Sequence, residues 1–362
     1  MNKMKVGILT FVNTVNFGAS LQAFALQEMI ESFGMQAEVI QYVNQDIENA
    51  EKNKGKISLK GLLKKFVMGK ELKNKAEKFR VYEEKQIHAG SLLTSQNTVE
   101  VNQMYDFFIT GSDQVWNTKL THTDWTYFLN FVQDNSKKIS YAPSFGNIPL
   151  PEEKYEQTAK YLNEIQALSV REASGAELIH SLTGKNAEVV LDPTLLLARE
   201  DWERYCEFVP PIKKYILVYF PHDKKKTFAF VDKLKEKTGL PVVYLSISPR
   251  KQAGTKTIYD ASPEEFLGWM LYADYVVTGS FHGTAFSLNL EKQFFYEPSG
   301  KGSRIDNLVH LTGTENRSID NAEVMENIID YEPVREKLSV EREKSKKWLK
   351  NALSKGRISY GK

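Results

Sequence analysis

The chain has a single cysteine, Cys206, among its 362 residues. An internal disulfide is therefore excluded, and so is a metal centre built from several thiolates. No apolar stretch is long enough to cross a membrane. The apolar residues 6–12 end at Asn13 without the small residues of a cleavage site, so no signal peptide is predicted. We expect a cytoplasmic protein.

Neither sign of charge predominates. The 48 Lys and Arg residues nearly balance the 46 Asp and Glu residues, which leaves a formal net charge of +2. This balance provides no strong attraction for nucleic acid, and no nucleic-acid partner is expected. With 41% hydrophobic and 26% charged residues, the chain is typical of a globular protein long enough for two domains.

The common cofactor and catalytic signatures are absent as well. The sequence has no three-glycine dinucleotide fingerprint, Walker loop, Gly-x-Ser-x-Gly elbow or His-Glu-x-x-His pair. Neither a nicotinamide cofactor nor a metal site is therefore predicted. Five histidines are scattered along the chain, and we interpret each as structural or exposed: His88, His122, His180, His222 and His310.

What the chain does contain is an alternation of short apolar strands and helices. Residues 6–42 are predicted to form a strand, a helix and a strand, a βαβ unit that indicates a parallel sheet. A second series of the same kind begins at residue 215. We expect an α/β fold with two Rossmann-like parallel-sheet domains, residues 1–200 and 201–332, facing a ligand cleft.

Two segments stand outside this pattern. Residues 46–88 are rich in lysine with intermittent apolar positions, and we predict an exposed helical insertion. Its charge is typical of a solvated face; a lid, a partner surface or peripheral contact with acidic lipid at the inner membrane face are the alternatives. Residues 333–362 predict a charged helical tail, which either packs back on the first domain or projects into solvent.

The chain from residue 275 onwards predicts a buried strand, a Gly-Ser turn and then a helix. N–H groups at a helix start lack partners and carry partial positive charge, so Gly283 and Thr284 are predicted to bind an anion. His282 stands beside them and titrates near neutral pH, which suits proton transfer. The alternative is a core or capping histidine at a tight turn.

The loop at residues 111–117 combines small residues, a carboxylate, two amides and a tryptophan. Such residues suit a sugar, whose hydroxyls pair with Asp or Asn and whose apolar face lies on an aromatic ring. An ordinary turn, with the tryptophan as a core anchor, is the alternative. The loop after the first strand provides two further candidates, which an ordinary βα turn explains equally well. The predicted substrate-binding residues are Asn16, Gly18, Ser112, Asp113, Gln114, Trp116 and Asn117.

Two further loops carry cations that suit an anionic substrate. Arg171 can hold a carboxylate or phosphate through two parallel hydrogen bonds, or it forms a structural ion pair with Glu172 or Glu177. Lys301 and Arg304 lie in a glycine-rich loop and are candidate anion ligands, with a solvated loop as the alternative.

Several of these segments together resemble the polysaccharide pyruvyl transferase family. The matching pieces keep one order and cover most of residues 5–312. They are Asn-Phe-Gly-Ala at 16–19 with Gln22, Gly-Ser-Asp-Gln-Val-Trp-Asn at 111–117, Ser-Val-Arg-Glu at 169–172, Leu-Asp-Pro-Thr at 191–194, and the histidine segment 278–286.

This resemblance implies a two-domain enzyme of the glycosyltransferase-B architecture that uses phosphoenolpyruvate as donor and needs no cofactor or metal. Such enzymes place a pyruvate ketal across two hydroxyls of a sugar such as galactose or N-acetylmannosamine. The resemblance makes His282 the catalytic histidine and places Arg171 near the donor. The expected acceptor is a saccharide or a lipid-linked oligosaccharide in the biosynthesis of a cell-surface polysaccharide.

One position departs from the family's pattern. The better-known members have an arginine two residues before the histidine, and this chain has Ser280. A serine cannot replace the charge of a guanidinium. Three explanations are open: Arg304 or Lys301 supplies the missing charge, the donor is bound differently, or the reaction has been lost. The alternative functions are a nucleotide-sugar-dependent glycosyltransferase of the same architecture and a catalytically silent saccharide-binding protein.

Overall fold

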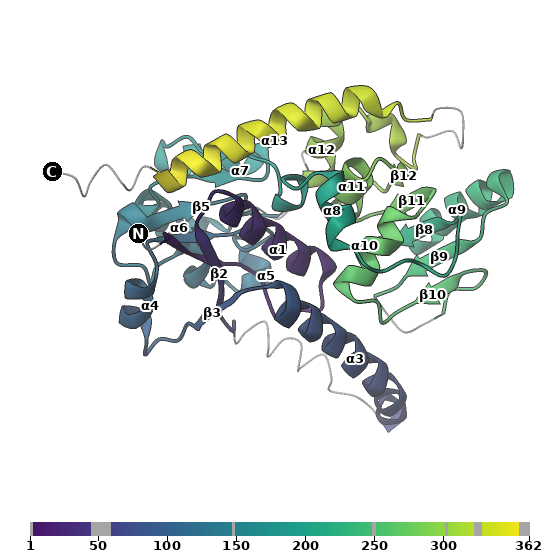
Figure 1. Cartoon of the computed structure of the whole chain (residues 1–362), viewed down its shortest axis with the longest axis horizontal. Coiled ribbons are helices and arrows are strands. Elements are labelled where there is room, and N and C mark those ends of the chain that lie inside the picture. The colour runs from purple at the N-terminus through teal and green to yellow at the C-terminus, as the bar shows by residue number, and fades with distance from the viewer. Residues whose placement is uncertain are drawn as a thin grey trace.

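The computed structural model describes residues 3–44, 59–146, 149–247, 251–300, 303–321 and 328–354, with the backbone alone for residues 59–71. Two parallel sheets stand beside each other, each with helices around it (Figure 1). We call them, with their helices, the N-terminal unit (purple to blue) and the C-terminal unit (green). The expected α/β fold with two parallel sheets is confirmed.

The N-terminal sheet has five parallel strands in the order β3-β2-β1-β4-β5. They are β1 (Lys5–Leu9), β2 (Gln36–Gln41), β3 (Ala89–Leu92), β4 (Phe107–Thr110) and β5 (Lys138–Ser140). Every residue of β4 is buried, as expected for a central parallel strand covered on both faces. A short parallel pair, β6 (Ser169–Val170) and β7 (Glu188–Val189), forms a separate sheet.

The C-terminal sheet repeats this arrangement with the order β10-β9-β8-β11-β12. Its strands are β8 (Ile216–Tyr219), β9 (Val242–Leu245), β10 (Lys256–Ile258), β11 (Tyr275–Thr278) and β12 (Gln293–Tyr296). In both sheets the strand order reverses direction between the two central strands, β1 and β4 in one and β8 and β11 in the other.

Helices connect and cover these strands. The α-helices of the described residues are α1 (Phe17–Ser32), α3 (Leu59–Gln86), α4 (Thr98–Met104), α5 (Thr118–Thr121), α6 (Tyr155–Glu164), α7 (Ala173–Thr183), α8 (Arg199–Tyr205), α9 (Lys224–Thr238), α10 (Pro263–Leu271), α11 (Phe281–Asn289), α12 (Arg304–Thr312) and α13 (Tyr331–Ser354). The short 3₁₀ turns are η1 (Trp125–Phe128), η2 (Asn135–Lys137), η3 (Glu152–Lys154), η4 (Pro193–Leu195) and η5 (Glu315–Arg317). None of these helices is long and apolar enough to cross a membrane.

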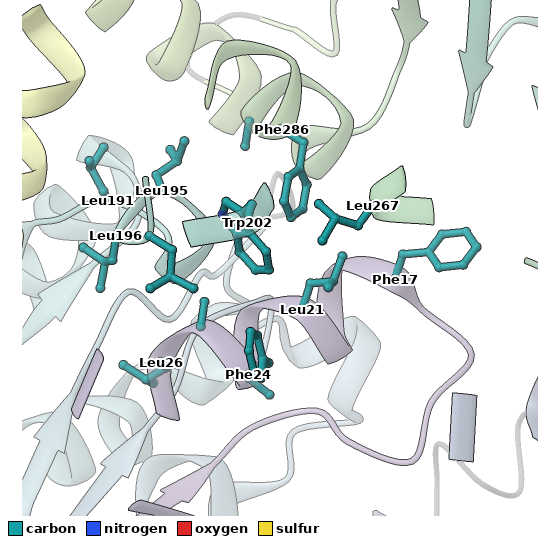
Figure 2. Packing of buried hydrophobic residues seen from close by; sticks show 14 of the residues in the cluster. Phe17, Leu21, Phe24, Leu26, Leu191, Leu195, Leu196, Trp202, Leu267 and Phe286 are labelled. Carbon is teal, nitrogen blue, oxygen red and sulfur yellow. The ribbon is translucent and has the colours of Figure 1, made fainter. Parts of the chain in front are cut away.

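One apolar core joins the two units through α1, α8 and α11. The Trp202 ring of α8 lies 6.0 Å from Phe24 of α1 and 5.1 Å from Phe286 of α11, measured between ring centres. Figure 2 shows these rings with Leu21 and Leu267 packed around them. Because α1 is enclosed by both units, it is buried around most of its circumference rather than on one face.

The C-terminal helix α13 runs across both units (yellow in Figure 1). Arg342 donates from Nε to the carbonyl of Leu195 at 2.7 Å and from Nη2 to Oδ1 of Asn289 at 2.9 Å. Further along the helix, Oγ of Ser345 accepts a hydrogen bond from the N–H of Leu191 at 3.0 Å. These contacts tie the helix to segments of both units.

Several predicted elements differ from those observed. The sequence did not indicate β3 or β10, which lie at sheet edges. Arg304, the last residue of the predicted loop 299–304, begins α12, a helix that the sequence did not indicate and that Ser303 caps. Of the predicted insertion at 46–88, residues 59–86 form α3, while residues 45–58 lie outside the described part of the chain.

Candidate active site

A cavity of about 320 Å³ lies between the two units. It is lined by the segments that follow β1, β4, β8 and β11, the central strands on which the strand order reverses. Open parallel sheets bind their ligands at this place. The N-terminal unit contributes Val15, Asn16, Phe17, Lys75, Asp113 and Gln114. The C-terminal unit contributes Tyr219, Phe220, His222, Ile247, Gly279, Ser280, Phe281, His282, Ser299, Arg304 and Ile305.

His282 lies in the first turn of α11, on the cavity wall, and is 7% exposed. Its ring packs against Gly18 at the start of α1, where an added Cβ would lie 2.0 Å from Nδ1. Only a glycine therefore allows the ring this position. The second nitrogen, Nε2, is buried without a hydrogen-bond partner among the described residues. Gly18 was predicted from the sequence to bind substrate, whereas in the structure it contacts the ring of His282.

The carboxylate near this histidine is Asp192, whose Oδ2 lies 3.8 Å from Nε2. Burial lowers the pKa of His282 below its ordinary value of 6.5, against the attraction of Asp192 and Asp113. Arg171 and Arg304 lower this pKa further, since both repel a charged imidazole. His282 is therefore held neutral at pH 7.

Ser280 caps α11, because its side chain accepts a hydrogen bond from the N–H of Gly283. The N–H of Thr284 donates to the carbonyl of Ser280 at 2.9 Å. The helix thus starts at Phe281, three residues earlier than the sequence indicated, and the N–H groups of Gly283 and Thr284 are already bonded. Neither Gly283 nor Thr284 lines the cavity, whereas Ser280 does.

Arg171 belongs to a buried network rather than to the cavity wall. Its Nη2 lies 2.8 Å from Oδ2 of Asp192, with both side chains almost fully buried, and also donates to Oγ of Ser112. Burial alone would raise the pKa of Asp192, but the charges of Arg171 and His282 outweigh it and hold that pKa below its usual range. The structural ion pair expected with Glu172 or Glu177 is instead formed with Asp192.

Arg304 approaches this network from the cavity. It is the first residue of α12, and its guanidinium lies 5.6 Å from the ring centre of Phe281. The guanidinium of Arg171 lies 4.8 Å from the same ring. Burial and the nearby Arg171 lower the pKa of Arg304, because two like charges share one region. The predicted partner cation, Lys301, lies outside the described residues.

Only part of the 111–117 loop reaches the cavity. Asp113 and Gln114 line it, and Asn16 faces it from the cap of α1. Trp116 is fully buried, with its ring stacked 5.0 Å from Phe128, so the sugar-stacking role predicted for it is wrong. The remaining two residues of this prediction have structural partners instead: Ser112 bonds Asp192, and Asn117 caps α5.

The lining residues that sequence reasoning did not predict include His222, Tyr219 and Lys75. His222 bonds the carbonyl of Gly279 through Nε2 at 2.7 Å and lies on the wall, although it was interpreted as structural or exposed. Tyr219 ends β8, and its place at a strand end was the available signal. No sequence signal distinguished Lys75, because it lies in a segment where lysine is frequent.

Among solved structures, a Listeria monocytogenes protein provisionally assigned as a UDP-N-acetylglucosamine 2-epimerase superposes with a TM-score of 0.52, 12% identity, and coverage of 97% of this chain and 91% of that one. Staphylococcus aureus MnaA in complex with UDP gives a TM-score of 0.51, 13% identity and the same coverage values. At such identities the likeness concerns the fold, which is glycosyltransferase-B-like.

No curated protein matches the chain. The family model described as polysaccharide pyruvyl transferase matches residues 16–297. This match covers most of both units, including the cavity residues Asn16, Asp113 and His282 and the buried Arg171. The chain therefore belongs to the polysaccharide pyruvyl transferase family.

Proposed function

We propose that this protein transfers the pyruvyl group of phosphoenolpyruvate onto two hydroxyls of a saccharide, as a ketal, in the biosynthesis of a cell-surface polysaccharide. The observation that supports it is His282, which lines the cavity and whose buried Nε2 has no hydrogen-bond partner among the described residues. Cationic Arg304 and Lys75 line the same cavity, so it suits an anionic donor beside a proton acceptor.

The proton path that this site supports has two stages. Neutral His282 takes the proton of the first sugar hydroxyl, and its imidazolium returns that proton to the methylene carbon of the donor as the C2–O bond forms. Asp192, 3.8 Å from Nε2, stabilises the transient imidazolium. The second hydroxyl then attacks C2, the bond from C2 to the phosphate oxygen breaks, and phosphate leaves with the second hydroxyl proton.

The two sides of the cavity differ in a way that suits two substrates. Arg304 and the ring of His282 lie on the C-terminal unit and Lys75 reaches the same cavity from α3, so we place the donor beside these groups. The carboxylate of Asp113 and the amides of Gln114 and Asn16 lie on the N-terminal unit and suit sugar hydroxyls, so we place the acceptor there. The scheme needs no metal, and metal independence is part of the proposal.

The test incubates the protein with phosphoenolpyruvate and a panel of galactosides and N-acetylmannosamine glycosides. We expect phosphate release that requires both substrates, together with the mass gain of a ketal. In His282→Ala the rate should fall by roughly 10²- to 10⁴-fold, the range for loss of a general acid–base group. His310→Ala is the matched control, because His310 is an exposed histidine outside the cavity.

Other outcomes would redirect the assignment. Release of a nucleoside diphosphate from a sugar nucleotide, without turnover of phosphoenolpyruvate, would indicate a glycosyltransferase. Binding of a sugar without turnover of either donor would indicate a catalytically silent saccharide-binding protein. Either result would contradict pyruvyl transfer.

A further inference from the structure

Lys75 differs from its neighbours on the lysine-rich helix α3. Its side chain is 4% exposed and lines the cavity, whereas Lys73 on the same helix is exposed. The ammonium of Lys75 lies 5.1 Å from the ring centre of Phe17 and 5.0 Å from that of Tyr259. These rings belong to different units, so the ammonium stands where the two units meet.

This ammonium makes no ion pair among the described residues. The adjacent Lys78 does, since its Nζ lies 2.9 Å from Glu265 and 3.8 Å from Asp260. Asp260 attracts Lys75 only at longer range, and burial lowers the pKa of Lys75 to about 8 against that attraction. A buried charge without a partner is costly, and contacts with two aromatic faces offset only part of the cost.

We propose that Lys75 binds an oxyanion of the donor substrate in the cavity. The inference rests on the proposed function. Ser280 stands where the better-known family members have an arginine, and Lys75 of the helical insertion would supply that positive charge. The Lys78–Glu265 ion pair joins α3 to α10 of the C-terminal unit and keeps this part of the helix in place. The insertion thereby becomes part of the substrate site rather than a solvated face.

An ammonium binds phosphate and carboxylate oxyanions alike, since it is a compact charge without the planar fork of arginine. The donor carries both groups. Two fragments therefore separate the sources: inorganic phosphate has only the first group, and pyruvate has only the second.

The experiment measures binding of phosphoenolpyruvate by calorimetry to the full chain and its variants. For Lys75→Met we expect affinity to fall by about tenfold or more, because a charge-assisted contact is lost. Lys75→Arg should retain part of the affinity, and Lys73→Met should bind as the wild type does. Loss of affinity for inorganic phosphate but not for pyruvate would assign the ammonium to the phosphate group, and the converse to the carboxylate.

Thermal unfolding of the same variants separates binding from a structural role. If Lys75 only joined the two units, Lys75→Met would lower the melting temperature and leave the affinity for phosphoenolpyruvate unchanged. That result would overturn the inference and leave the proposed function standing. Lys75→Gln serves as a second neutral variant if the Met variant does not fold. Failure of the wild type to bind or turn over phosphoenolpyruvate would overturn the proposed function, and the inference with it.

Discussion

Two charged regions meet at Phe281, and they satisfy their charges in opposite ways. In the buried network, Arg171 and Asp192 lie 2.8 Å apart and neutralise each other inside the protein. At the cavity, Lys75 has no ion-pair partner among the described residues, and His282 lines the wall with its buried Nε2 lacking a hydrogen-bond partner there. The paired region shapes the site, and the unpaired region leaves groups available to a substrate.

The largest expected effect comes from breaking the paired region. Asp192→Asn removes the carboxylate and leaves the Arg171 guanidinium buried without compensation, so the free energy of unfolding should fall by about 3–5 kcal/mol. Urea unfolding measures this loss. Asp201→Asn is the control, because Asp201 pairs with Arg204 at the surface and should cost under about 1 kcal/mol. Equal losses in the two variants would contradict a special role for the buried pair.

Gly18→Ala tests the cavity region by displacing the ring of His282. An added Cβ would lie 2.0 Å from Nδ1 of His282, so the ring must shift while the backbone of α1 remains in place. We expect the rate of phosphate release to fall about a hundredfold, the effect of a misplacement of ~1 Å, together with a loss of about 1–3 kcal/mol of stability from overpacking. Gly175→Ala is the control, since its nearest neighbour lies at 3.5 Å. Full activity in Gly18→Ala would show that the ring position is not required.

The pH dependence of stability reports on the same histidine. Because burial lowers the pKa of folded His282 below 6.5, the unfolded chain takes up a proton that the folded chain does not. The free energy of unfolding should therefore fall as the pH drops below 6.5, by at most ~1.4 kcal/mol per pH unit from this residue. Subtracting the profile of His282→Gln isolates this contribution. A difference that does not change between pH 6.5 and 5 would contradict a buried neutral histidine.

The smallest expected effect concerns the loop at residues 111–117, in which Trp116 lies in the core and Gln114 lines the cavity. Trp116→Phe loses the 3.0 Å hydrogen bond from Nε1 to the carbonyl of Tyr127, worth about 1 kcal/mol of stability, and part of the packing of this buried ring. It should leave the KM for the acceptor unchanged, whereas Gln114→Ala should raise that KM and keep the melting temperature. Steady-state kinetics with unfolding curves check both. A raised acceptor KM in Trp116→Phe would return the tryptophan to the substrate site.

The strands that sequence reasoning located are those rich in β-branched and aromatic residues. Val276 and Val277 in β11 are examples, and both are fully buried. The edge strand β3 was missed because its sequence, Ala-Gly-Ser-Leu, has low strand propensity and is ordered by pairing with β2. The start of α11 was placed late because only the folded turn shows that Ser280 caps the helix.

The candidate site was predictable to the extent that it lies at strand ends. His282, Asp113, Gln114 and Asn16 were predicted from their loops and do line the cavity. Trp116 could be a sugar platform or a core anchor, and its stacking on Phe128 is a contact that the loop's own sequence does not contain. The rest depended on which distant segments pack together.

The order of apolar and polar residues by itself determined the two parallel sheets, and the motifs in the loops at strand ends indicated the family. Only the tertiary structure decided which charges are paired. It brought Asp192 to Arg171 and placed Lys75 among aromatic rings without an ion pair. The reason is physical: desolvation and Coulomb attraction depend on burial and distance, which are properties of the folded chain and not of residue order.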